Sequence, residues 1–170
     1  MYVAGEDCSA ASTSVKENLP GIKNNISLVP LFRGAWRLTP YVILPSTPAG
    51  TRAVIEMPDG RLEGRGVCAR TQGGANADWF VIGPDGTGTA DFRGTVVTED
   101  GAAIYLYGHG RCDISAGFSA GSILRGHAHF ETGSDEYRWL NKVHAVFRGV
   151  VVGDGAAGEG VYYDEYFEVL

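Results

Sequence analysis

Short apolar runs of β-type sequence, cut at nearly regular intervals by glycine, proline and aspartate, constrain the fold of this chain most. The runs occupy residues 31–38, 41–44, 52–57, 61–69, 78–82, 87–98, 102–110, 123–131, 142–152 and 160–169. Helical periodicity is almost absent, and only 134–140 loses strand alternation enough for a short helical turn. About nine short strands with so little helix indicate an antiparallel barrel or sandwich.

The turns between the runs support antiparallel pairing. Asp59-Gly60, Asp85-Gly86 and Asp100-Gly101 each place aspartate before glycine between two apolar runs. This order is a strong local signal for a β-hairpin, because both residues tolerate the backbone conformations that tight turns require. The pattern therefore predicts hairpins at these three places and a meander connectivity.

Length and charge bound the domain organisation and the partners. A chain of 170 residues is long enough for one domain with its own core. Residues 1–26 show no sustained period and are predicted to be a disordered N-terminal arm, which leaves 27–170 as the barrel domain. The net charge is −6, with Lys and Arg scattered, which argues against nucleic-acid or membrane partners.

The cysteines and the N-terminus bear on the cellular compartment. Cys8, Cys68 and Cys112 form neither a disulfide framework nor a zinc motif, although one bridge, such as Cys68 to Cys112, stays open. No run approaches the ~20 apolar residues of a membrane span, and the first 25 residues lack the order of a signal peptide. We expect a cytoplasmic protein, with secretion left open by the sequon at Asn25 if a leader was removed.

Seven motifs, taken in order, resemble one family. They are Gly50-Thr51-Arg52, 60–66, 74–79, Asp91-Phe92-Arg93, Asp100-Gly101-Ala102, Phe130-Glu131-Thr132 and 137–141. This order is similar to that of the family of unknown function DUF3237, also called UPF0311, from Leu31 to the C-terminus. The resemblance implies a single antiparallel β-barrel of about eight to nine strands, like allene oxide cyclase, dirigent proteins and lipocalins. It also implies a homodimer or homotrimer, and no cofactor.

The chain departs from the family pattern at two places. Asn76 and Ala77 are inserted into what is otherwise Gly-Gly-Ala-Asp-Trp, and 153–160 forms a long glycine-rich loop. The insertion lies beside Asp78, so a role for Asp78 does not transfer directly from the family.

Asp91 and Arg93 are two apart in a predicted strand and so share a face. If that face lines the barrel, Arg93 supplies a fixed cation for a developing oxyanion and Asp91 orients it. The alternative is a structural ion pair, which the spacing favours slightly.

Glu131 is the candidate for acid–base chemistry at the end of 123–131. It shares a face with His127 and His129, and a carboxylate against aromatic walls tends to have a raised pKa. The alternative is an exposed polar face, which we favour for the two histidines.

Further donors lie on 102–110. Tyr105, Tyr107 and His109 share one face and are candidate ligand contacts. An alternative is a metal site in which His109 and His144 join His127 and His129. The spacing of these histidines is too loose to indicate a metal site, so a protein without metal is favoured.

Aromatic residues offer surface for a flat or polyunsaturated ligand. Trp79, Tyr137 and Trp139 are the candidates, and their alternative role is core packing, which is usual for aromatics in small barrels. Phe80 and Phe130 add further aromatic surface. Asn141 either fixes a ligand oxygen or closes a turn.

Two functions fit these patterns. The first, which we favour, is a cofactor-independent enzyme of specialised metabolism that isomerises or cyclises a small hydrophobic intermediate, by a pericyclic or dehydrative step among others. In this function, Glu131 or Asp78 moves a proton and Arg93 or a tyrosine hydroxyl stabilises charge. The second is a non-catalytic barrel that binds or carries such a compound.

Overall fold

The computed structural model describes residues 25–117 and 121–170, and within them the protein is almost entirely β-structure. The strands are β1 (Leu28–Arg37), β2 (Val42–Thr47), β3 (Gly50–Glu56), β4 (Asp59–Gly64), β5 (Val67–Thr71), β6 (Ala77–Ile82), β7 (Thr87–Thr98), β8 (Ala103–Asp113), β9 (Ile123–Thr132), β10 (Ala145–Val152) and β11 (Val161–Val169). One short 3₁₀ helix, η2 (Arg138–Lys142), follows β9. The prediction of an all-β fold is confirmed.

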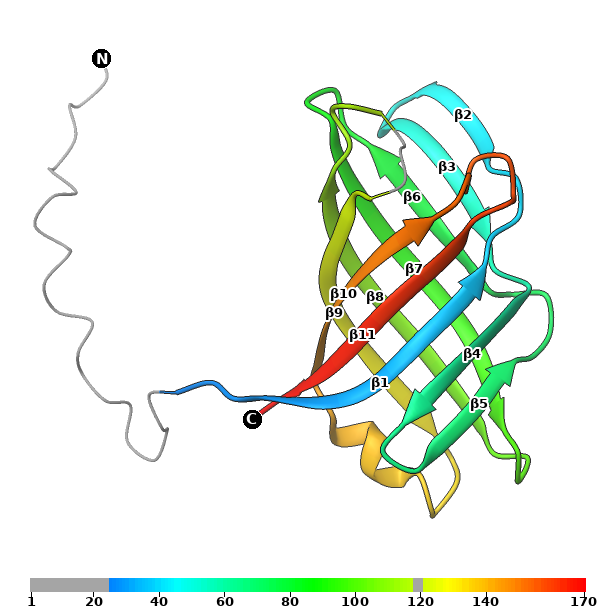
Figure 1. The fold of residues 1–170 in the computed structure, drawn as a ribbon, viewed down its shortest axis with the longest axis vertical. Helices are drawn as coiled ribbons and strands as arrows, with labels where there is room; N and C mark the ends of the chain where they lie inside the picture. The colour runs from blue at the N-terminus through cyan, green and yellow to red at the C-terminus, as the bar shows by residue number, and fades with distance from the viewer. Residues whose placement is uncertain (1–24, 118–120) are drawn as a thin grey trace, which may run out of the picture.

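Eight of the strands close into an antiparallel barrel (Figure 1). Around the barrel the neighbours are β7, β5, β4, β1, β11, β10, β9 and β8, and β8 pairs with β7 to complete the circle. Closure leaves these eight strands without a free edge, which removes the exposed backbone groups that promote association. The predicted single antiparallel barrel is therefore confirmed.

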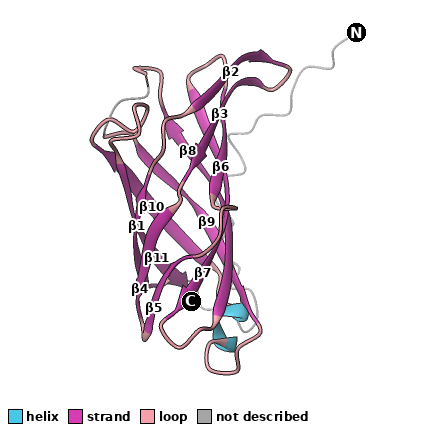
Figure 2. Cartoon of the chain, turned by 90° about the vertical axis from the view of Figure 1, so that its right-hand side faces the viewer, coloured by secondary structure: helices cyan, strands magenta, loops and turns pink. Residues whose placement is uncertain are grey.

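Three more strands extend the wall outside this circle. The N-terminal part of β7 pairs with β6, and its C-terminal part pairs with β5. From β6 the sheet continues through β3 to β2. Figures 1 and 2 show β2 and β3 at the end of the molecule opposite to η2.

Alternation along the strands builds the core, as β7 shows. Its even-numbered positions, such as Ala90, Phe92 and Val96, are buried, while the odd-numbered ones are half-buried or exposed. This period of two places apolar side chains inside the barrel and polar ones outside.

The end of the barrel covered by η2 is densely packed. The rings of Phe32 and Phe130 meet edge to face with centroids 5.3 Å apart. Leu140 of η2 is fully buried against this end. The predicted helical turn in 134–140 thus corresponds to η2, displaced by a few residues, and it covers one mouth of the barrel.

Two details of the predicted strands were wrong. The run 61–69 is two strands, β4 and β5, joined by a tight turn in which Arg65 and Gly66 have positive φ. The Asp59-Gly60 pair does not close a hairpin, because β3 pairs with β2 and β6 while β4 pairs with β1 and β5. The other two predicted hairpins, β6–β7 and β7–β8, are present, so the chain is a meander only in part.

The predicted arm falls mainly on residues 1–24, outside the described residues, as does Cys8. Cys68 and Cys112 are both free thiols. None of the helices in the described part of the chain has the length and apolar character to span a membrane.

Candidate functional site

A cavity of about 380 Å³ lies in the half of the barrel away from η2. Its apolar wall consists mainly of Trp36, Leu38, Ile55, Met57, Phe80, Phe92, Leu106, Ile114, Leu124 and Val151. Its polar groups include Tyr41, Asn76, Asp78, Cys112, Asp154, Tyr162 and Asp164. This volume suits a small organic ligand, and a few polar groups on apolar walls are typical of such sites.

Asp78 of β6 lies in the cavity wall and is 8% exposed. Its Oδ1 accepts the N–H of Asp91 at 2.8 Å, where the β6–β7 pairing is interrupted between Asp78 and Val81. Burial raises the pKa of Asp78 to about 7, against the lowering effect of the Asp91 N–H. A carboxyl group that titrates near neutrality can both accept and donate a proton.

Asp164 of β11 is the second buried acid of the cavity. The indole N–H of Trp36 donates to both of its carboxyl oxygens at 3.1 Å, and the hydroxyl of Tyr166 donates to Oδ2 at 2.7 Å. The backbone N–H of Gly34 donates as well. Burial nevertheless raises the pKa of Asp164 to about 7. These donors fix the carboxyl group in one orientation.

Glycines on both neighbouring strands make room for Asp164 and for Tyr162. Asp164 is opposite Gly34 of β1 and Gly149 of β10. A Cβ atom at Gly34 would overlap Oδ1 of Asp164, and one at Gly149 would overlap the hydroxyl of Tyr162. The cavity therefore depends on the absence of side chains at these two positions.

Tyr162, two residues before Asp164 and also in the cavity wall, has an unsatisfied hydroxyl. The oxygen is buried and has no hydrogen-bond partner in the described part of the chain. Burial raises its pKa well above the usual value, and the charges of Asp164 and Asp78 raise it further. A buried hydroxyl without a partner is unfavourable, so a ligand oxygen that accepted a hydrogen bond from it would relieve this cost.

Two further groups of the cavity resist ionisation. Burial, followed by the charges of Asp154 and Asp78, raises the pKa of Tyr41 to about 12. Burial also raises the pKa of the Cys112 thiol, so Cys112 is a poor nucleophile at neutral pH.

Cationic groups are nearly absent from the cavity. Arg93 is the one Lys or Arg among the described residues that borders it. The side chain of Arg93, however, is half exposed, and its Nη2 lies 3.2 Å from Oδ1 of Asp91. Its Cζ lies over the exposed ring of Trp79, 5.9 Å from the ring centroid. The predicted ion pair is present, on the outer side of the strand. Within the described residues, an anionic ligand would thus meet three acids, Asp78, Asp154 and Asp164, and no free cation.

Most of the other residues singled out in the sequence also lie on the outer face. They are Trp79, Asp91, Tyr105, Tyr107, His109, His129 and Glu131. Tyr105 is opposite Glu131, and Tyr107 is opposite His129. The predicted shared faces are correct, but the face that they share points away from the cavity, so Glu131 lies outside it.

The four histidines of the chain form a surface cluster. His129 Nε2 is 3.1 Å from His144 Nδ1, and the rings of His109 and His127 have centroids 5.7 Å apart. No three His, Cys, Asp or Glu side chains in the described ranges are placed to hold a metal ion. Burial, then the charges of the other histidines, lowers the pKa of His127.

The remaining predicted ligand contacts lie at the η2 end. The Tyr137 hydroxyl donates a hydrogen bond to Oδ1 of Asp100 at 3.2 Å. The ring of Trp139 packs against the ring of Phe32, with centroids 6.4 Å apart. Asn141 accepts from the N–H of Thr132 and donates to its carbonyl oxygen. These residues close the packed end of the barrel.

Sequence reasoning missed Tyr41, Tyr162 and Asp164. A signal was present in β11, where Asp164 shares its face with Tyr162 and Tyr166. An acid between two tyrosines on one strand face is a candidate for burial with hydrogen-bond donors.

Comparison with known proteins identifies the family. The profile described as "Protein of unknown function (DUF3237)" matches residues 26–167. The chain belongs to this family. No curated protein matches this DUF3237 chain.

Solved structures share its fold. A protein of unknown function from Clostridium acetobutylicum superposes with a TM-score of 0.75 at 19% identity, covering 86% of this chain and 100% of its own. A beta-barrel like protein from Acinetobacter baumannii superposes with a TM-score of 0.72 at 27% identity, covering 88% of this chain and 99% of its own. A protein from Penicillium herquei described as an enzyme superposes with a TM-score of 0.64 at 23% identity, covering 89% of this chain and 100% of its own.

Proposed function

We propose that this DUF3237 protein is a cofactor-independent enzyme that isomerises or cyclises a small hydrophobic intermediate, with Asp78 as the proton-transfer group. The observation that carries the proposal is the buried carboxyl group of Asp78 in the wall of an apolar cavity of about 380 Å³. Sequence patterns favoured the same reaction class with Glu131 as the first candidate for proton transfer and Asp78 as the other, but Glu131 lies on the outer face.

A proton-transfer step follows from the side chains of the cavity. Asp78 as carboxylate removes a proton next to a ligand carbonyl, and the electron pair moves onto the carbonyl oxygen. The Tyr162 hydroxyl donates a hydrogen bond to that oxygen and stabilises the charge. Asp78 then returns the proton to another carbon, so the product is an isomer and the enzyme is restored. A ring closure that takes and returns one proton uses the same groups.

Asp164 acts through its neighbours in this scheme. Its carboxyl group is occupied by Trp36, Tyr166 and the N–H of Gly34. Burial, and after it the charge of Asp164, raises the pKa of Tyr162, so that this hydroxyl stays protonated as a donor. We therefore assign Asp164 as a positioning residue.

The absence of a free cation in the described cavity wall favours a neutral ligand. Three acids, Asp78, Asp154 and Asp164, around an apolar space would repel a carboxylate or phosphate. The description of the Penicillium herquei structure as an enzyme supports catalysis in such a barrel.

A carrier barrel is the second candidate. The observation in its favour is the predominance of apolar residues in the wall, which suits binding without reaction. The two functions differ in one respect, because a carrier returns its ligand unchanged.

A ligand screen followed by product analysis tests the proposal. Neutral hydrophobic compounds with a carbonyl or hydroxyl group are screened by thermal shift, and each compound that binds is incubated with the protein and followed by chromatography with mass spectrometry. The proposal expects a product of unchanged mass, or of a mass lower by one water. Asp78→Asn should lose turnover by at least about 100-fold, the scale of general acid–base catalysis, and retain ligand affinity.

Glu131→Gln is the matched control, since it makes the same kind of change on the outer face. It should retain turnover. Full turnover in Asp78→Asn would refute the role of Asp78, and ligands that bind without any product would favour the carrier.

A further inference from the structure

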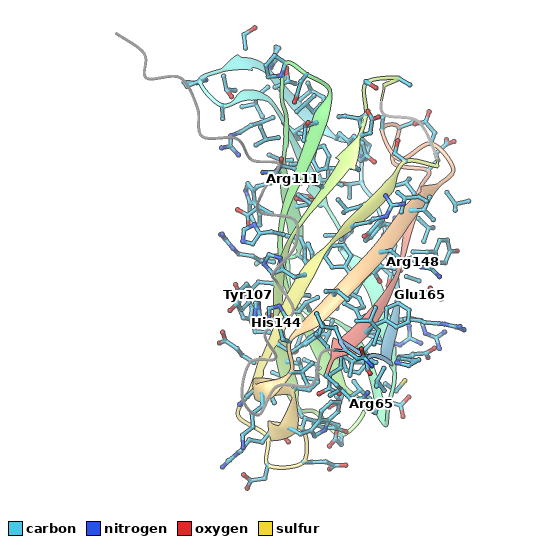
Figure 3. The ribbon with its side chains drawn as sticks, turned by 90° about the vertical axis from the view of Figure 1, so that its left-hand side faces the viewer. Arg65, Tyr107, Arg111, His144, Arg148 and Glu165 are labelled. Atoms are coloured by element: carbon cyan, nitrogen blue, oxygen red, sulfur yellow. The ribbon has the colours of Figure 1, made fainter. Side chains whose placement is uncertain are left out.

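Three arginines form a row across the outer wall of the barrel. Strand register places Arg111 of β8 opposite Arg125 of β9, and Arg125 opposite Arg148 of β10. All three side chains are exposed. Figure 3 faces this wall and marks Arg111 and Arg148 on it. We call Arg111, Arg125 and Arg148 the arginine row.

The row is only partly neutralised. Arg148 pairs with Glu165 at 2.9 Å, and Glu165 also lies 3.5 Å from Arg33, so one carboxylate serves two arginines. Neither Arg111 nor Arg125 makes an ion pair within the described ranges. Arg111 does contribute, as the weakest of several causes, to the lowered pKa of Asp85. Arg125, in the centre, has a cation on each side.

This arrangement is unfavourable unless an anion binds to it. Like charges directly opposite on neighbouring strands destabilise a sheet. The chain has 20 acidic and only 14 basic residues, yet three of its arginines adjoin without an acid between them. By contrast, of the opposed pair Arg61 and Arg70 on β4 and β5, Arg61 has an ion pair with Glu63.

Rings extend the surface below the row. The next outward positions on β8 and β9 are His109 and His127, and beyond them Tyr107 stacks on His129 with centroids 5.2 Å apart. Figure 3 marks Tyr107 and His144 in this region. Flat rings beside guanidinium groups are typical of surfaces that bind protein partners.

We propose that the arginine row binds an acidic segment of a partner protein. Guanidinium groups bind carboxylates through paired hydrogen bonds. The net charge of −6 repels long polyanions, such as nucleic acids and anionic membranes. A short acidic segment interacts mainly with the charges within the Debye length of about 8 Å, where the row dominates. This proposal is independent of the reaction in the cavity.

Binding of fluorescein-labelled hexaglutamate to the full chain, followed by fluorescence anisotropy, tests the proposal. The double variant Arg111→Glu with Arg125→Glu should weaken binding by about ten-fold or more, the scale of one charge-assisted contact. The double variant Arg61→Glu with Arg70→Glu makes the same change in net charge on β4 and β5, and should bind as the unmodified chain does. Thermal unfolding checks that both variants are folded.

Three outcomes would overturn the proposal. Hexaglutamate could fail to bind, or both double variants could lose affinity equally, which would show an effect of net charge alone. A single-stranded oligonucleotide or a phosphatidylserine vesicle could bind through Arg111 and Arg125 more tightly than hexaglutamate, which would identify a different class of partner.

Discussion

The indole N–H of Trp36 donates to both carboxyl oxygens of Asp164 at 3.1 Å, joining residues that are 128 positions apart in the sequence. The contact links the first strand of the barrel to the last and fixes a buried acid in the cavity wall. Because the same carboxyl group lies against Gly34, packing and chemistry in this half of the barrel are coupled.

The first prediction concerns Gly34→Ala. The new methyl group would overlap Asp164 and lie 2.5 Å from Nε1 of Trp36, so it should break their hydrogen bond. We expect the free energy of unfolding to fall by about 2 kcal/mol or more, as for overpacking with a lost hydrogen bond. Urea unfolding measures this free energy in Gly34→Ala and in the unmodified protein. Gly133→Ala, where nothing lies within 4 Å, is the control and should change stability by less than about 0.5 kcal/mol.

The second prediction compares two tyrosines of β11. Tyr162→Phe removes a buried hydroxyl that lacks a partner within residues 25–117 and 121–170, so the protein should become more stable by about 1 kcal/mol. Tyr166→Phe removes a donor to Asp164 and should lower stability by about 2 kcal/mol. Thermal and urea unfolding check both values. Equal effects of the same sign would contradict the assignment of Tyr162 as the open donor.

The third prediction concerns pH. The pKa values of Asp78 and Asp164 are raised from 3.8 to about 7 in the folded protein. Between about pH 4 and 7 the folded state therefore keeps protons that the unfolded state has released. The free energy of unfolding should fall as pH rises through this window, by up to about 1.4 kcal/mol per pH unit for each acid.

Variants isolate this pH effect from that of His127, whose lowered pKa acts in the opposite direction. Asp78→Asn should show a shallower fall of stability with pH than the unmodified protein, when both are measured by urea unfolding. An unchanged slope would mean that Asp78 ionises normally.

The fourth prediction uses Cys112 to report on the cavity. This thiol is half-buried in the cavity wall and its pKa is raised by burial, whereas Cys68 is exposed. Iodoacetamide should therefore modify Cys112 more slowly than Cys68 at neutral pH. A bound ligand should slow Cys112 further and leave Cys68 unchanged, as peptide mass spectrometry would show. Equal protection of both thiols would argue against occupancy of this cavity.

The sequence predicted the barrel because its signals are local. Strand alternation and the turns at Asp85-Gly86 and Asp100-Gly101 depend on residues close in the chain. Asp59-Gly60 has the same local signal, but β3 and β4 find their partners elsewhere in the sheet. Pairing between distant strands depends on contacts that a turn does not encode.

The candidate site was harder to predict, because alternation shows which residues share a face but not which face is inside. On β8, the large residues Tyr105, Tyr107 and His109 share one face, and the other face carries Gly108 and Gly110. The glycines face inward, since a Cβ at Gly108 would lie 2.6 Å from the ring of Phe92. Rings from other strands fill that volume, which a single strand cannot reveal.

Titration of the Asp78 side-chain carboxyl carbon by NMR tests the central claim most directly. Comparison of the unmodified protein with Asp78→Asn assigns the resonance. The account predicts that Asp78 titrates with a pKa near 7 in the free protein, and that a cavity-bound ligand shifts its resonance. A pKa below about 5, within the ordinary range for aspartate, would contradict the claim that Asp78 is a buried proton-transfer group.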